Sequence, residues 1–382
     1  MNPLYLTLGF AVIAYSGTTA ARVVLSLFAL ELGADASQVG FLMATFYVFP
    51  LLLSWPIGVL ADRIGSRKLL LFGFAVGTAG LLIPYFFPNI RALYAAGLLG
   101  GMAFVFSNVL VQNLIGLLSE PHERARNFSN ASLAGSASNI AGPLIAGLAI
   151  DHAGHGIASA SAAALFAVAW VMVAVWGASL PGGSGKPAEA SKGSLKERLS
   201  DKAVLGVILM TCLIQVGQDL YMFYMPVYGH GIGLSATAIG SILAAFAAAA
   251  CVVRVVLPQI ITRYGEERVL AAAFFSATFG FMLLPFFQNA IVLGAISFAF
   301  GLGQGCGMPI TMMMLFSKSP PGRSGETVGL RQTMNNLGRI ITPPIFGLIA
   351  SATGLMAVFL ISGVLMGVGG WMAKPRTGRA EI

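Results

Sequence analysis

Charged residues are scarce in this sequence. Asp, Glu, Lys and Arg make up only 9% of its 382 residues, whereas 57% are hydrophobic. A soluble globular domain carries about 25% charged residues, and the mean hydropathy here is +0.84. The shortage of charge therefore excludes a soluble globular chain and predicts an integral membrane protein, in contact with membrane lipid along most of its length.

Cysteine and histidine are rare as well. The three cysteines, Cys212, Cys251 and Cys306, fall inside apolar runs without the spacing of metal ligands, so we interpret them as small buried hydrophobes. The four histidines lie in or near predicted loops and form no H-E-x-x-H pattern. We also find no pairing of a nucleophile with a base. We therefore expect no metal site, no cofactor and no enzymatic activity.

The formal net charge of +8 would by itself suggest a nucleic-acid partner. Apart from Arg91, however, the basic residues outside the apolar runs fall into loops on one predicted side of the membrane. Lys and Arg are enriched in cytoplasmic loops. The charge excess therefore indicates topology and no nucleic-acid partner. It predicts a multi-pass protein of the bacterial inner (cytoplasmic) membrane with both termini in the cytoplasm.

Hydropathy separates twelve apolar spans, each close to the ~20 residues that a membrane helix needs. They cover residues 4–29, 37–61, 68–87, 92–118, 129–151, 157–179, 204–228, 236–262, 267–286, 290–316, 327–351 and 354–373. The stretch after the sixth span has the Gly, Ser, Lys and Glu of a solvated linker, with a short amphipathic helix expected over 194–201. We predict an all-α membrane protein of two parallel six-helix halves: 1–180, a cytoplasmic linker over 181–203, 204–373, and a cytoplasmic tail over 374–382.

The two predicted halves repeat. An offset of 200 residues aligns residues 62–65 with residues 262–265, and Gly154 with Gly354. In transporters built from such repeats, the substrate site lies near the middle of the membrane at the interface of the halves. We therefore expect the site at this interface.

A short charged turn, residues 58–68, joins the second and third spans. Gly58 and Gly65 permit a close helix end and a tight turn. Asp62 can pair with a cation or a helix N-terminus, and Arg63 and Arg67 hold the turn in the cytoplasm. The stretch G-V-L-A-D-R-I-G-S-R-K resembles the loop between helices 2 and 3 of the major facilitator superfamily. The resemblance implies a twelve-helix secondary transporter that works by alternating access, with a conformational role for this turn.

A second, partial resemblance lies in the fifth span. Residues 142–147 are similar to the superfamily's G-P-x-x-G-G motif, with alanine in place of the first closing glycine. This implies a conformational role for Gly142, Pro143 and Gly147 and favours export. In the fourth span, however, Gly97 stands where many proton-coupled exporters of the family carry an arginine. That difference weakens the usual exporter mechanism.

Five ionisable side chains fall inside the spans, where charge is costly and function is the default hypothesis. They are Arg22, Asp219, Arg254, Arg331 and Arg339. Four positive charges against one negative favour an anionic ligand or an internal pairing network. Arginine suits a carboxylate because its guanidinium donates two parallel hydrogen bonds. We expect Arg22, Arg254 and Arg339 to bind substrate, with an Arg22–Asp219 pair as the alternative, and Arg331 to serve as a gate or a snorkelling residue.

Polar side chains accompany these charges at helical spacing. Thr19, Gln215, Asn335 and Asn336 are expected to bind substrate, with interhelical hydrogen bonding as the alternative. Asp219 is the one carboxylate predicted near mid-membrane, so we expect it to carry a coupled proton.

Together these features predict a monomeric, proton-coupled transporter of a small organic anion, and we favour a carboxylate. Basic residues in the eighth and eleventh spans, here Arg254 and Arg339, are similar to the arrangement in carboxylate carriers of the superfamily. The alternative is a proton-driven multidrug exporter. In that case Asp219 would attract cations, and the tyrosines of the seventh span would form an aromatic wall.

Overall fold

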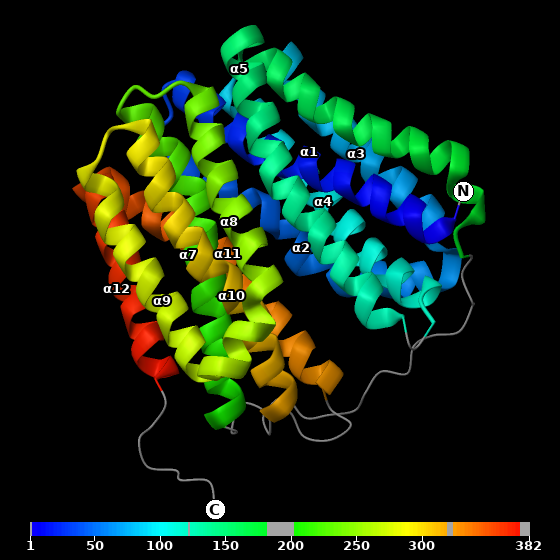
Figure 1. The fold of residues 1–382 in the computed structure, drawn as a ribbon. Coiled ribbons are helices and arrows are strands. Elements are labelled where there is room, and N and C mark those ends of the chain that lie inside the picture. Colours follow the sequence, from blue (N-terminus) through cyan, green and yellow to red (C-terminus); the bar gives the residue numbers. More distant parts are fainter. Residues whose placement is uncertain (1, 121–122, 182–201, 319–323, 375–382) are drawn as a thin grey trace, which may run out of the picture.

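The computed structural model describes residues 2–120, 123–181, 202–318 and 324–374 (Figure 1). The N-terminal helices are α1 (Pro3–Glu31), α2 (Ala36–Ile64), α3 (Ser66–Phe86), α4 (Ile90–Leu118) and α5 (Arg124–Trp176), followed by the 3₁₀ turn η1 (Gly177–Ser179). The C-terminal helices are α7 (Lys202–Gly231), α8 (Ala236–Tyr264), α9 (Glu266–Leu283) with η2 (Leu284–Phe286), α10 (Ala290–Lys318), α11 (Ser324–Thr353) and α12 (Leu355–Ala373). The described residues contain no strand, which confirms the predicted all-α class. The predicted short helix over 194–201 lies outside the described residues.

The helices account for twelve membrane passages. Ten helical segments are long and apolar enough to cross a membrane. One of them, Asn130–Ser179, has 50 residues and bends at Gly154, so it supplies two passages. The remaining passage is α11, which has 30 residues but is less apolar because Arg331, Arg339 and several amides interrupt it. The helices agree with the predicted spans to within a few residues at most ends.

The backbone shows the repeat that the sequence predicts. Every described residue with a positive φ is a glycine, and the six form three pairs that are 200 residues apart. They are Gly33 (82°) and Gly233 (78°), Gly65 (84°) and Gly265 (80°), and Gly154 (80°) and Gly354 (87°). A Cβ disfavours this conformation, so glycine fixes the turns between helices at matching points.

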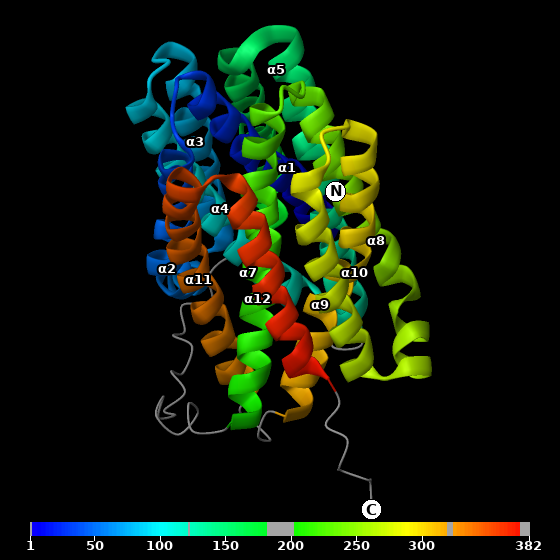
Figure 2. The same ribbon diagram turned by 90° about the vertical axis from the view of Figure 1, so that its left-hand side faces the viewer.

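The helices run between two faces of the bundle (Figures 1 and 2). We give the name termini face to the side at which α1 starts, in the N-terminal group of helices, and to the side at which α12 ends, in the C-terminal group. The turns at Gly33, Gly154, Gly233 and Gly354 lie at the opposite face, which we call the far face. That the termini face is cytoplasmic stays a prediction.

The N-terminal and C-terminal helices pack closely near the far face, where α2 contacts α11 and α5 contacts α8. Glycine makes this approach possible. A Cβ added to Gly40 would overlap the carbonyl oxygen of Pro343, and one added to Gly240 would overlap that of Pro143. From this contact the two groups of helices run in diverging directions toward the termini face (Figure 1).

Hydrogen bonds join the same helices at the far face. The Asp151 carboxylate, near the bend of α5, accepts the backbone N–H groups of Ala236 (3.0 Å) and Thr237 (2.7 Å) in the first turn of α8. At the matching positions, Ser351 Oγ of α11 accepts the backbone N–H of Ser37 in α2 at 3.1 Å. A negative charge at a helix N-terminus is favourable. Equivalent hydrogen bonds thus join the halves at two places on the far face: a charged one from α8 to Asp151 of α5, and an uncharged one from α2 to Ser351 of α11.

Candidate functional site

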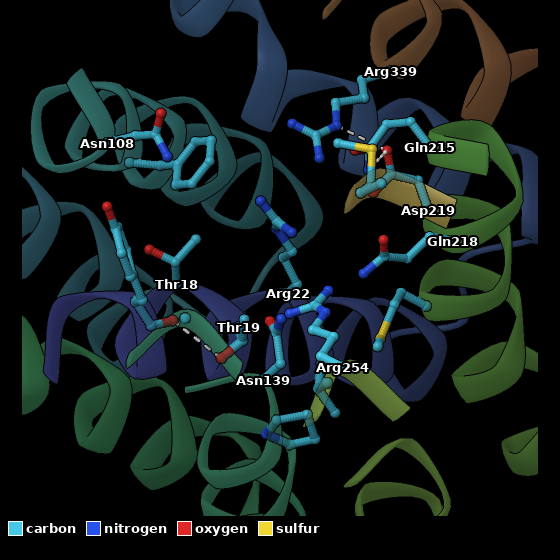
Figure 3. Close-up of a pocket in the computed structure, with 17 residues that line it drawn as sticks. Thr18, Thr19, Arg22, Asn108, Asn139, Gln215, Gln218, Asp219, Arg254 and Arg339 are labelled. Atoms are coloured by element: carbon cyan, nitrogen blue, oxygen red, sulfur yellow. Dashed lines mark hydrogen bonds and ion pairs between the residues drawn. The ribbon is translucent and has the colours of Figure 1, made fainter. Parts of the chain in front are cut away.

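A cavity of about 320 Å³ lies between the N-terminal and C-terminal helices (Figure 3). It is at the small end of ligand pockets, which span about 300–1,000 Å³. Its lining comes from α1, α4, α5, α7, α8, α10 and α11. The residues predicted for substrate or proton binding that line it are Thr19, Arg22, Gln215, Asp219, Arg254 and Arg339.

A second cavity, of about 200 Å³, adjoins the first and shares Asn108, Gln215 and Arg339 with it. Asn335 and Asn336 line this second space. Both precede Arg339 on α11, so the second cavity extends the first toward the termini face. The stripe of polar residues that makes α11 less apolar is therefore directed to the interior of the bundle and away from lipid, as buried polar groups require.

Asp219 and Arg339 form an ion pair across α7 and α11. Arg339 Nε donates to Asp219 Oδ2 at 2.8 Å, and the two side chains are only 17% and 9% exposed. Gln215, one helical turn before Asp219, donates from Nε2 to the same oxygen at 3.1 Å. The carboxylate is thus paired with Arg339, and we find no Arg22–Asp219 pair among the described contacts. In this structure the partner of Asp219 is thus Arg339, and not Arg22, which the sequence offered as an alternative.

Arg22 projects from α1 against aromatic rings. Its guanidinium carbon lies 5.2 Å from the ring centroid of Tyr47, 5.3 Å from that of Phe104 and 6.0 Å from that of Phe46. Its Nε is buried and has no hydrogen-bond partner. Arg339 approaches the same Tyr47 ring at 5.1 Å. Tyr47 therefore packs against an arginine from each half, since the ring faces attract cations.

Arg254 joins the halves by a different contact. Its Nη1 donates to Ser136 Oγ of α5 at 2.8 Å, and its Nε donates to the Gly305 carbonyl of α10 at 3.4 Å. Both acceptors are neutral. The described contacts of Arg254 therefore include no acidic partner for its guanidinium next to the cavity.

Arg331 lies apart from both cavities. Its side chain is buried, with 7% exposure, and its Nε and Nη1 have no hydrogen-bond partner. The predicted gating or snorkelling role of Arg331 stays a prediction.

The turn between α2 and α3 has the geometry that its glycines suggest, because Gly65 both ends α2 and precedes α3. Gly58 lies in the last turns of α2, and Arg63 is exposed. Arg67 Nη2 donates to the Ala174 carbonyl of α5 at 2.9 Å, which ties the turn to that helix. The side chain of Asp62 lies outside what the structure describes.

The second predicted motif packs α5 against two neighbours. A Cβ on Gly142 would overlap Thr19 Oγ1 of α1, and one on Gly147 would overlap the Ala236 carbonyl of α8. Pro143 lines the cavity and meets Gly240 with its carbonyl. The motif thus lies where the halves close at the far face. Its role in the conformational change stays a prediction.

Several lining residues were missing from the predicted site: Tyr15, Thr18, Asn108, Asn139 and Gln218. The repeat held the signal for two of them, because Tyr15 and Asn139 lie 200 residues before the predicted Gln215 and Arg339. Thr18 and Gln218 are the neighbours in sequence of the predicted Thr19 and Asp219. Asn108 is part of a polar pair on α4, because Gln112 Nε2 donates to its Oδ1 at 2.8 Å.

The tyrosines of α7 do not line the cavity. Tyr224 donates its hydroxyl to the Pro343 carbonyl at 2.6 Å, and Tyr228 donates to the Phe287 carbonyl at 2.8 Å. Tyr221 packs on the rings of Phe246 and Phe300. Their contacts are those of packing residues, so the aromatic wall of the multidrug alternative is not found here. Within the described residues no group of His, Cys, Asp or Glu could hold a metal ion.

Comparison with known proteins identifies the family of this chain. The family model described as Major Facilitator Superfamily matches residues 7–343 and 207–381. The multidrug resistance protein MdtG of Enterobacter lignolyticus is 23% identical over an alignment of 339 positions, which covers 86% of this chain and 79% of that protein. A probable sulfoacetate transporter, SauU of Cupriavidus necator, is 22% identical over 173 residues, 45% of this chain and 40% of that protein.

Solved structures support the fold. A crystal structure of a mutant of the nucleoside transporter NupG superposes with a TM-score of 0.79 at 14% identity, covering 96% of this chain and 98% of that chain. At this identity the likeness is one of fold.

Proposed function

This chain belongs to the major facilitator superfamily of transporters, and we propose that it carries a small organic anion, by preference a carboxylate, through alternating access coupled to protons. In this proposal it is a monomer in the bacterial inner membrane with the termini face in the cytoplasm. The cavity between the halves is the substrate site, open in turn to either face.

One observation carries the proposal: the described residues that line the interface cavity include three with guanidinium groups and a single carboxylate. A buried charge is costly unless it is paired. An anion entering this cavity gains charge-assisted hydrogen bonds, the strong kind, whereas a cation meets repulsion. Thr19, Asn139 and Gln218 add neutral hydrogen-bonding groups on the same walls.

Asp219 supplies the proton coupling in this proposal. Its carboxylate holds Arg339 at 2.8 Å, so a proton on Asp219 removes the negative charge and releases Arg339 toward the cavity. The released guanidinium then binds the substrate anion. Proton and anion thus load together, and loss of the proton restores the Asp219–Arg339 pair.

Multidrug efflux is the second candidate, favoured by the name of MdtG, which matches most of this chain. In that mechanism Asp219 would attract a lipophilic cation. Two features argue against multidrug efflux: Asp219 is already paired with Arg339, and the arginines that line the cavity would repel a cation.

The test is thermal stabilisation of purified protein by carboxylates, phosphorylated sugars and cationic drugs, because a ligand that binds the folded state raises its melting temperature. We expect carboxylates to stabilise the parent but not Arg254→Gln or Arg339→Gln. Arg91→Gln, an exposed arginine outside the cavity, is the matched control. Stabilisation by lipophilic cations alone, abolished in Asp219→Asn, would establish the efflux reading instead.

Proton coupling has its own test. In proteoliposomes, Asp219→Asn should lose the dependence of anion uptake on an imposed pH gradient while still exchanging anion for anion. Uptake by this variant with an unchanged response to the gradient would rule out Asp219 as the proton carrier.

A further inference from the structure

The charges that line the cavity do not cancel. Among its described lining residues Asp219 is the one acidic side chain, against Arg22, Arg254 and Arg339. The balance is three positive charges minus one negative, which leaves two positive charges. The identity of the two uncompensated arginines determines what the cavity can hold.

Arg339 is the compensated arginine as long as Asp219 is ionised. Its Nε lies 2.8 Å from Asp219 Oδ2, and Gln215 Nε2 donates to the same oxygen. The carboxylate therefore has two donors on one oxygen, from its own helix and from α11. This group of three side chains is neutral as a whole.

Arg22 and Arg254 are the uncompensated pair. Arg22 contacts aromatic rings, and its buried Nε has no acceptor. Cation–π contacts offset only part of the cost of burying an ion. Arg254 donates only to a hydroxyl and a backbone carbonyl among its described contacts.

The two side chains come from different halves and converge. Arg22 projects from α1 and Arg254 from α8, and Figure 3 shows both guanidinium groups directed into the same central space. Asn139 and Thr19 lie beside them in this view. Two like charges that face one space repel each other, and two negative charges placed there would relieve the repulsion completely. One negative charge would leave a buried cation unpaired.

We propose that the substrate is a divalent organic anion, such as a dicarboxylate, with its anionic groups held between Arg22 and Arg254 and with Arg339 as a further donor once a proton on Asp219 releases it. This inference rests on the proposed function and narrows it from organic anions in general to those with two negative charges. A cavity of about 320 Å³ accommodates a short chain between the two charged ends. Because each arginine belongs to one half, the dianion also bridges the halves across the cavity.

The experiment compares ligands that differ in one charge but hardly in shape. Dicarboxylates from malonate to adipate and their monoamides are titrated calorimetrically into purified protein near neutral pH. We expect the best dicarboxylate to bind at least about tenfold more tightly than its monoamide, equivalent to about 1.4 kcal/mol. In Arg22→Gln and in Arg254→Gln the same ratio should fall toward unity.

Two control variants show whether a lost preference for the dicarboxylate reflects a lost charge or a misfolded protein. Arg22→Lys retains the positive charge and should retain a preference for the dicarboxylate. Arg91→Gln, outside the cavity, should leave the ratio unchanged.

The outcomes separate the two proposals. Equal binding of dicarboxylates and monoamides, abolished by Arg254→Gln, would overturn the dianion inference and leave the organic-anion function standing. A dicarboxylate preference that survives in both glutamine variants would overturn the assignment to Arg22 and Arg254. If no anion binds to the parent, both proposals fail.

Discussion

Replacing Asp151 should open the far face of the transporter. Its carboxylate accepts two backbone N–H groups from the first turn of α8, and these bonds cross between the halves. They must break when α5 and α8 separate at this face. A negative charge at an exposed helix N-terminus contributes about 0.3–1 kcal/mol, and Asp151 is exposed. Asp151→Asn should therefore shift the equilibrium between closed and open far faces by up to about fivefold.

The matched control is Ser351→Ala, which removes the uncharged contact at the equivalent position. A single neutral hydrogen bond at an exposed site should contribute less, so the shift should be about twofold or smaller. Spin labels at Leu32 and His230, both exposed at far-face helix ends on opposite halves, report the separation by double electron–electron resonance. An unchanged distance distribution in Asp151→Asn, or equal shifts in the two variants, would refute the reasoning.

Two further predictions concern packing. Gly40→Ala should lower the free energy of unfolding by about 1–3 kcal/mol, because the added Cβ overlaps the backbone carbonyl of Pro343. The control is Gly116→Ala, which should have no such effect because no packing neighbour lies within 4 Å of its Cβ position. Equal melting temperatures of the two variants would contradict the tight contact at Gly40. Tyr47→Phe should leave stability and anion binding intact, since it removes only an unpartnered buried hydroxyl. Tyr47→Leu should lower the free energy of unfolding by about 0.5–1 kcal/mol for each arginine on the ring. Calorimetric unfolding and ligand titration check both variants, and equal effects would show that the aromatic ring does not hold the two guanidinium groups.

The sequence alone predicts the fold well because hydropathy and glycine placement are local signals. The spans follow from the length that a bilayer imposes, and the turns follow from glycines such as Gly65 and Gly265 whose φ is positive. The bend at Gly154 matches the predicted gap between spans five and six, although the helix continues on either side of it.

The candidate site is predictable only in part, because a single sequence does not state which helices face each other. Arg22, Asp219, Arg254 and Arg339 are found by their cost in a membrane, and all four line one cavity. The choice of partner for Asp219 required the relative placement of α7 and α11, and the sequence equally allowed Arg22. Asp151 was missed because its acceptor role depends on the start of α8, 85 residues away along the chain.

The repeat nevertheless identifies more of the residues that line the cavity than the buried charges do. Several lining positions occur as pairs 200 residues apart: Tyr15 and Gln215, Thr18 and Gln218, Thr19 and Asp219, Arg22 and Met222, Asn108 and Met308, Asn139 and Arg339. The positions are shared by the two halves, but the side chains differ in every pair. The scaffold thus brings equivalent points of both halves to one cavity, while the chemistry at those points has diverged.

This divergence has a direction. In one pair the N-terminal half supplies the guanidinium of Arg22, and the equivalent residue of the C-terminal half is Met222. In another pair the C-terminal half supplies Arg339, and the equivalent residue of the N-terminal half is Asn139. The arginines are therefore distributed over both halves, although no pair contains two of them. A ligand held by such a set touches charge on each half, so its binding energy depends on how the halves are oriented. In the alternating access that we propose, a substrate held by both halves can therefore shift the equilibrium between the two orientations, because only a ligand with different affinity for them can do so.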